Sequence, residues 1–186
     1  MLLLGLVNRP QAQSQPDSLV MDLKFTEISA NDFMKSQLAY FEARQNPEVT
    51  FESLGLTVTS DCDEICEAYL VEKATGEKMW LPSNFDAGVA DLLFSPLGKH
   101  LIVFSSYDGP DYGNFYDYRS EFYVYAVGKE KGLKALQLTG EYTSKDWSME
   151  AIVWMNNQTI VLKVYEGPRS GSSAVGGYKY LKSVLE

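Results

Sequence analysis

The tetrapeptide Tyr-acid-Gly-Pro occurs twice in this chain of 186 residues, as "YDGP" at 107–110 and as "YEGP" at 165–168. Each copy closes a short run of β-branched and aromatic residues, which is typical of a β-strand. Glycine and proline at the end of such a run interrupt the hydrogen-bonded ladder and redirect the backbone. The two copies therefore predict two equivalent points at which a strand ends and a loop begins.

An internal repeat extends around both tetrapeptides. With two single-residue gaps, "DLLFSPLGKHLIVFSSYDGP" aligns with "AIVWMNNQTIVLKVYEGP". Downstream, "YVYAV" at 123–127 aligns with "YKYLK" at 178–182, after loops of nearly equal length. The sequence therefore predicts two units of strand, turn, strand, long loop and strand, over about 89–127 and 149–182.

The sequence of the N-terminal part of the domain predicts one strand followed by one long helix. Residues 19–28 alternate between apolar and polar side chains, which indicates a strand with one face in water. Ser29 and Asp32 have the spacing of a capping box, and Pro47 stops the helix that they begin. The apolar residues Phe33, Leu38 and Phe41 lie on a broadly shared face of this helix.

The remaining segments are short, rich in β-branched or aromatic residues, and separated by turn residues. Strands are expected at 49–59, 66–73, 77–82, 89–95, 100–106, 120–127, 133–139, 149–155, 158–165 and 177–184. Hairpin turns are expected at "EKATGEK" and "SPLGK", residues 72–78 and 95–99. The predicted fold class is mostly β, an antiparallel meander with one N-terminal helix, in a single domain over 17–184.

The segment "FSPLGKHLIVFSS" resembles the F-S-P-D-G-K-x-L-x-F-x-S signature of blades in WD-repeat-like and Tol-Pal-type β-propellers, and "WMNNQTIVL" is similar to a degraded copy. The resemblance covers about residues 66–184, with Leu97 in place of the turn aspartate. It implies a meander of propeller-like blades. A blade takes roughly 40–45 residues and a closed propeller at least four blades, whereas this chain has room for about three. We therefore expect an open arrangement, in which the strand at 19–28 could supply the missing outer strand of the last unit.

The charge balance limits which classes of binding partner are expected. The formal net charge is −9, and the longest basic cluster, at 127–134, is interrupted by glutamate and glycine. Nucleic acid and anionic membrane both require clustered Lys and Arg, so neither is expected as a partner. No segment offers the ~20 consecutive apolar residues of a membrane-spanning helix.

The N-terminus "MLLLGLVNRPQAQSQPDS" is similar to the apolar and cleavage regions of a secretory signal. Small residues at Ala12 and Ser14 would precede the cut, so that residues 1–14 are a signal-peptide remnant and Gln15 begins the mature chain. The basic region that normally opens such a signal is missing. The predicted location is periplasmic, secreted or on the cell surface, and the alternative is a flexible cytosolic tail.

The two cysteines, Cys62 and Cys66, are expected to form a disulfide that acts as a local staple. A redox role would require a lowered thiol pKa, whereas four neighbouring acidic residues would raise it. Those neighbours are Asp61, Asp63, Glu64 and Glu67. A metal site would need more ligands than two thiols, and the chain has one histidine.

The loops that follow the two tetrapeptides are the predicted functional surface. In a meander they leave the same edge of neighbouring units, so they should lie side by side. The candidate ligand-binding residues are Tyr107, Asp108, Asp111, Tyr112, Asn114, Tyr116 and Asp117 in the first loop, and Glu166 and Arg169 in the second. Aromatic faces with carboxylates and amides suit a sugar ring or a protein hot spot, and the same oxygen atoms could hold Ca²⁺. The alternative is that the tyrosines pack over the end of the sheet and the acids keep the loop soluble.

No assembled catalytic group is evident in the sequence, so no catalytic residue, resident metal or other cofactor is assigned. The sole histidine, His100, lies in a predicted hairpin, and the Gly-rich "GPRSGSSAVGG" lacks the Lys-Ser/Thr ending of a phosphate-binding loop. The predicted function is a non-enzymatic exported module that recognises a protein or glycan through loops on one rim. The alternative is a glycosidase-like hydrolase that uses carboxylates from the same loops.

Overall fold

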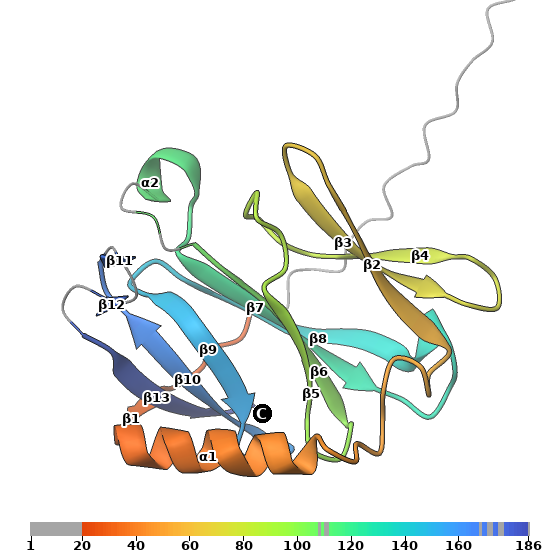
Figure 1. The fold of residues 1–186 in the computed structure, drawn as a ribbon, viewed down its shortest axis with the longest axis horizontal. Helices are drawn as coiled ribbons and strands as arrows, with labels where there is room; N and C mark the ends of the chain where they lie inside the picture. Colours follow the sequence, from red (N-terminus) through yellow and green to blue (C-terminus); the bar gives the residue numbers. More distant parts are fainter. Residues whose placement is uncertain are drawn as a thin grey trace, which may run out of the picture.

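The structure is a computed structural model that describes residues 20–107, 109, 112–167, 169–170, 173–174 and 177–185. It consists of three antiparallel sheets that pack face to face, with a small two-stranded hairpin and one long helix (Figure 1). The predicted fold class is confirmed: the chain is mostly β and, among the described residues, none of the three sheets closes on itself. The possible leader at 1–14 lies outside the described residues.

Each sheet is a meander of strands that follow one another in the sequence. The first sheet contains β2 (Leu56–Cys62), β3 (Cys66–Glu72) and β4 (Lys78–Leu81). The middle sheet contains β5 (Asp91–Phe94), β6 (His100–Ser106), β7 (Ser120–Val127) and β8 (Leu136–Ser144). The third sheet contains β9 (Ser148–Trp154), β10 (Thr159–Tyr165), β13 (Lys179–Val184) and β1 (Thr26–Glu27). Smaller elements are α2 (Tyr112–Phe115), the 3₁₀ turn η1 (Leu133–Ala135) and the hairpin β11 (Arg169–Ser170) with β12 (Ser173–Ala174).

The middle sheet is buried on both faces. Along β6, Leu101 and Val103 belong to the apolar cluster shared with the first sheet, whereas Ile102 and Phe104 belong to the cluster shared with the third. Successive side chains of a strand point to opposite faces, so this division places one core on each side of the sheet. The near-continuous apolar run of β6 follows from that double burial.

The helix α1 (Ala30–Ala43) begins as the sequence predicts. The Ser29 hydroxyl accepts from the Asp32 backbone N–H at 3.1 Å and donates to the Asp32 carboxylate at 2.7 Å. The face predicted for this helix is wrong in part, because Leu38 and Phe41 are 61% and 53% exposed. The buried residues are Phe33, Ser36 and Tyr40. Tyr40 is drawn inward because its hydroxyl donates to the Phe94 carbonyl at 2.7 Å, a contact that apolar periodicity cannot reveal.

The N-terminal segment completes the third sheet, as predicted, because β1 pairs with β13 at its outer edge. The predicted strand at 19–28 is nevertheless too long. Within the described part of this segment, only Thr26–Glu27 join the ladder, apart from one parallel bridge between Val20 and Glu141. The predicted apolar face does pack on the core, through Met21, Leu23, Phe25 and Ile28. The segment therefore crosses from the middle sheet to the third sheet instead of lying along one strand.

Two further strand boundaries differ from the prediction because turns occupy the expected positions. Residues 51–55 form turns before β2, where the backbone N–H of Leu54 donates to the Thr50 carbonyl at 3.1 Å. Gly55, with φ +74°, ends these turns. Similarly, Gly132, with φ +73°, precedes η1 and delays β8 to Leu136. Positive φ favours glycine, which explains where the turns end.

The two repeat units share the same meander, but their third strands align differently from the sequence alignment. Val103 of β6 lies opposite Tyr123, and the matching Leu162 of β10 lies opposite Leu181. Tyr123 therefore corresponds to Leu181, three residues beyond the predicted Tyr178. Ladder pairing decides this register, and the resemblance of two tyrosine-containing pentapeptides does not.

Candidate functional site

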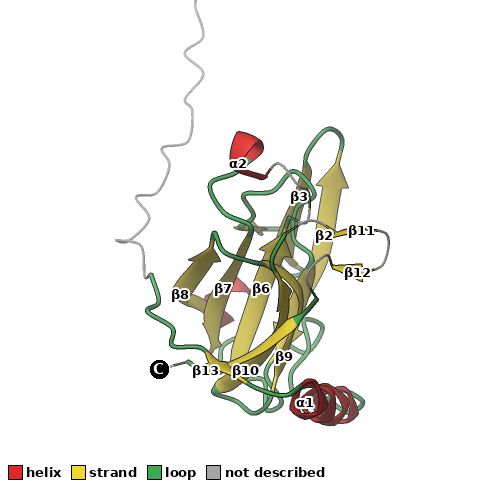
Figure 2. Cartoon of the chain, turned by 90° about the vertical axis from the view of Figure 1, so that its left-hand side faces the viewer, coloured by secondary structure: helices red, strands yellow, loops and turns green. Residues whose placement is uncertain are grey.

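The described parts of both Tyr-acid-Gly-Pro segments, Tyr107 with Gly109 and residues 165–167, lie at one end of the molecule, which we call the rim. It is the end at which β6 and β10 finish and at which α2 and the β11–β12 hairpin lie (Figure 1). A view turned by 90° shows α2 at the same end and α1 at the opposite end (Figure 2). The rim is therefore built from the two loops that the sequence predicts to lie side by side.

A buried arginine joins the two loops. The Arg119 guanidinium donates to the Gly167 carbonyl at 2.9 Å and to the Ser148 hydroxyl at 3.1 Å. That hydroxyl in turn donates to the Tyr107 carbonyl at 2.6 Å. Tyr107 and Gly167 belong to the first and the second tetrapeptide, so the network holds the two loops together. Neither Arg119 nor Ser148 was among the candidate site residues predicted from the sequence, since nothing near them in the sequence indicates what they contact.

Two of the predicted tyrosines form a packed aromatic cluster with a residue that the sequence did not indicate. Phe85 lies edge-on to Tyr116 with ring centroids 5.0 Å apart, and Tyr107 and Tyr116 lie 4.8 Å apart. Partial burial raises the pKa of Tyr116, whose hydroxyl accepts from the Asp86 backbone N–H at 3.4 Å. These two tyrosines therefore pack over the end of the sheet, which agrees with the alternative reading of the loop. Phe115, beside them on α2, is 72% exposed.

The other predicted residues do not form one cluster in the described part of the rim. Asn114 and Asp117 are exposed, and Glu166 forms an ion pair with Lys179. Asp108 and Asp111 lie outside the described residues, as do the side chains of Tyr112 and Arg169. Within the described residues, no group of three or more His, Cys, Asp or Glu side chains could hold a metal ion.

A cleft of about 320 Å³ opens between the repeat units at the rim. It is lined by Ala90, Asp91, Phe104, Ser106, Met149, Glu150 and Tyr165. Ser106 and Tyr165 are the last residues of β6 and β10, so the cleft lies directly below the two loops. Its carboxylates and hydroxyl group can form hydrogen bonds to a ligand. The strand ends predicted its position, but its two carboxylates, Asp91 and Glu150, were not selected from the sequence.

A buried carboxylate, Glu121, occupies the core near the rim and was also missed. It is fully buried and accepts from the backbone N–H and the side-chain amide of Asn84, both at 2.6 Å, and from the Tyr123 hydroxyl at 3.2 Å. Burial raises the pKa of Glu121, and these hydrogen bonds oppose the shift. A raised pKa in a carboxylic acid can mark a catalytic acid, but this group has no access to a substrate. Its contacts instead attach the connection between β4 and β5 to the middle sheet.

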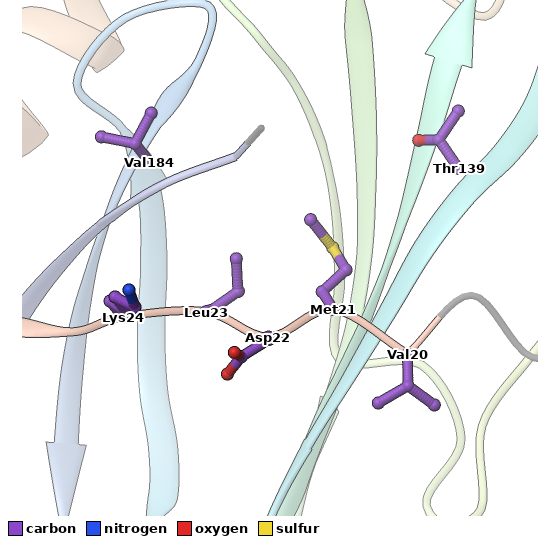
Figure 3. A pocket seen from close by; sticks show the side chains of 7 residues that line it. All are labelled: Val20, Met21, Asp22, Leu23, Lys24, Thr139 and Val184. Carbon is purple, nitrogen blue, oxygen red and sulfur yellow. The ribbon is translucent and has the colours of Figure 1, made fainter.

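A second cavity, of about 580 Å³, lies where the N-terminal segment crosses between the middle and third sheets. Residues 20–24 line it together with Thr139 and Val184 (Figure 3). Met21 and Leu23 point in one direction, and Val20 and Asp22 point in the other (Figure 3). The first pair packs on the core, so this cavity is the open side of a structural crossing.

The two cysteines and the single histidine make contacts that connect parts of the structure. Cys62 and Cys66 form the predicted disulfide, at the tip of the β2–β3 hairpin. The His100 ring stacks on Trp154 with centroids 5.8 Å apart, and its Nδ1 lies 2.9 Å from the Asn157 carbonyl oxygen. His100 therefore connects the β5–β6 turn to the β9–β10 turn, at the end opposite the rim.

Comparison with protein-family models, curated proteins and solved structures found no match for this chain. In the part of the chain that the structure describes, no helix has the length and apolar character needed to cross a membrane.

Proposed function

We propose that this protein is a non-enzymatic interaction module that recognises a protein or glycan through its rim. The observation that carries the proposal is the rim cleft, because the ends of both repeat units form it and the Arg119 network holds its two sides together. A concave site with a few polar groups among apolar walls is the usual form of a binding site. The exposed ring of Phe115 adds an aromatic contact at the same end of the molecule.

The rigidity of the cleft walls supports recognition without a large rearrangement. Phe104 and Tyr165 are buried, and Ser106 accepts from the Met149 backbone N–H at 2.8 Å. Glu150 is held by Lys163 at 2.6 Å. Side chains fixed in this way lose little conformational entropy when a ligand binds.

Export to an oxidising compartment is part of the same proposal. The Cys62–Cys66 disulfide supports it, because disulfides persist in secreted and periplasmic proteins. The apolar N-terminal run supports it as well. We also infer that the three sheets are blades of the propeller type, and their successive face-to-face packing supports that assignment.

The test is binding of the full chain to an array of immobilised glycans and, in parallel, to a displayed peptide library. Phe115→Ala and Asp91→Asn should each weaken the observed binding about tenfold or more, since each removes a contact at a recognition site. Met34→Ala, which removes an exposed apolar side chain from α1 at the far end, is the matched control and should bind normally. All three variants should melt within a few degrees of the wild type.

Two results would contradict the proposal. Binding that is unchanged in both rim variants would place the site elsewhere. Release of new reducing ends or cleaved peptides from a bound probe would show an enzyme, which is the carboxylate-dependent alternative.

A further inference from the structure

The outer face of the first sheet is the broad sheet surface that nothing covers among the described residues. The middle sheet is buried on both faces, and α1 packs on the outer face of the third sheet, where the rings of Phe33 and Tyr180 lie 5.3 Å apart. In the first sheet, Leu70 and Leu81 point into the core. Their neighbours Tyr69 and Trp80 therefore point outward, and Trp80 is 46% exposed.

Strand pairing arranges the side chains of this outer face in three rows. In order from the disulfide end, they are Asp61 with Glu67, then Thr59 with Tyr69 and Trp80, and then Thr57 with Val71 and Lys78. We call them the acid row, the aromatic row and the lysine row. None of these eight side chains is buried.

Charge is separated along this face. The acid row adjoins the hairpin tip, where Asp63 and Glu64 are also exposed. The lysine row adjoins the β3–β4 turn, where Lys73 pairs with Glu52. Within the face, the Tyr69 hydroxyl donates to Glu67 at 2.6 Å, and the Lys78 ammonium lies 5.6 Å from the centre of the Tyr69 ring. One end is therefore negative, the other carries the lysine, and aromatic rings lie between them.

We propose that a second copy of this chain docks face to face on this surface. The two copies are related by a two-fold axis that lies in the interface, perpendicular to the strands, at the level of the aromatic row. This axis places the acid row of each copy over the lysine row of the other and keeps each strand over its own counterpart. Glu67 of β3 therefore lies over Val71 and one strand away from Lys78, and this pairing occurs twice. It also brings Tyr69 and Trp80 against their counterparts. An axis parallel to the strands would instead place acid row over acid row, in a chain whose net charge is −9. Charge complementarity therefore selects the first arrangement.

The size of the face sets the strength of this dimer. Strands of 7 residues in a three-stranded sheet cover about 23 Å by about 14 Å, or about 300 Å² before side chains and turns are added. A stable interface buries about 800 Å² per partner. The dimer is accordingly weak and salt-sensitive, so it forms at high micromolar concentration and low ionic strength. It involves neither the rim nor its cleft, and it stands independently of the proposed function.

The first experiment is sedimentation equilibrium of the full chain from low to high micromolar concentration at low salt. Glu67→Lys and Lys78→Glu should each weaken dimerisation about tenfold or more, because each creates two like-charge contacts. Mixed in equal amounts, the two variants should form a heterodimer, since every contact is again between opposite charges. The matched controls, Glu42→Lys and Lys35→Glu, reverse exposed charges on α1 and should dimerise like the wild type.

A second measurement uses the tryptophans. Trp147 and Trp154 are buried, so acrylamide quenching of the exposed fraction reports on Trp80. Quenching should fall as protein concentration rises, and it should not fall in the Lys78→Glu variant. A chain that stays monomeric with constant quenching would overturn the proposal. A dimer that survives both charge reversals, or that Leu38→Ser on α1 abolishes, would place the interface elsewhere and would also overturn it.

Discussion

The middle sheet and the first sheet are both antiparallel meanders, yet their strands differ in composition. In the middle sheet, β6 reads "HLIVFSS" and β7 reads "SEFYVYAV", and both are buried along most of their length. In the first sheet, β2 reads "LTVTSDC" and exposes six of its seven residues. The difference follows from what covers each face, since the middle sheet has a neighbour on both sides and the first sheet on one. Near-continuous apolar strands therefore mark the sheet in the interior of the stack, and strands with exposed polar residues mark its open end.

The sharpest test of this comparison replaces two tryptophans in turn. Trp154 is buried between the third and middle sheets, and its indole N–H donates to the Leu93 carbonyl at 3.0 Å. Trp154→Ala should lower the free energy of unfolding by about 3–5 kcal/mol, because it opens a cavity and leaves that carbonyl without its partner. Trp80→Ala on the open face should cost about 1 kcal/mol or less. Urea unfolding followed by circular dichroism measures both, at a concentration where the chain is monomeric. Equal losses would contradict the assignment of covered and open faces.

The next largest effect is expected at the rim. Arg119→Met keeps an unbranched apolar stem but removes the donors to Gly167 and Ser148, so the free energy of unfolding should fall by about 2–3 kcal/mol. Arg44→Met is the matched control on α1. There the guanidinium of the exposed Arg44 lies 5.7 Å from the centre of the buried Tyr40 ring, so about 0.5–1 kcal/mol is expected. A loss at Arg119 as small as that at Arg44 would show that the network does not hold the loops.

The disulfide should contribute less than either buried group. Removing it with Cys62→Ser and Cys66→Ser together should lower the free energy of unfolding by at most about 2 kcal/mol, because the loop that it closes is short. Melting curves of the double variant and of the wild type give the difference. Thiol titration of denatured, unreduced wild type should find no free thiol, whereas two free thiols would disprove the bond.

The smallest expected effect concerns Glu121, the carboxylate on a covered face. Because burial raises its pKa in the folded state, the protonated form favours folding. That contribution is fully present below the ordinary glutamate pKa and is lost as pH rises through the raised value. Glu121→Gln removes the titration, so its stability relative to the wild type should increase from acidic to neutral pH. Melting temperatures at a series of pH values measure this slope.

The matched control for that slope is Glu141→Gln. Glu141 raises the pKa of Glu121 further, but less than burial does. Its replacement should therefore change the slope only weakly. A wild type and a Glu121→Gln variant with the same pH dependence would mean that Glu121 titrates as it does in the unfolded chain.

Sequence patterns predicted most of the strands because each is bounded by turn residues with local preferences. The capping box at Ser29, the hairpin turns and the glycine-proline strand ends are all decided within a few residues. The loops of the two units were also expected to lie side by side, and the Arg119 contacts connect them. The residues that make the rim cleft were less predictable. Asp91 and Glu150 are 59 positions apart, and the packing of two sheets brings them to one cleft.

The sequence by itself determined the periodicity of each strand, the start of the helix and the proximity of Cys62 to Cys66, because all three depend on neighbours along the chain. The tertiary structure alone decided which faces became core. Alternation shows which side chains share a face but not what will lie against that face. Tyr40 turned inward while Leu38 stayed exposed because of a carbonyl group 54 residues away. Glu121 was buried because the connection that carries Asn84 supplies its hydrogen bonds. Such contacts are long-range, so they exist only once the sheets have packed.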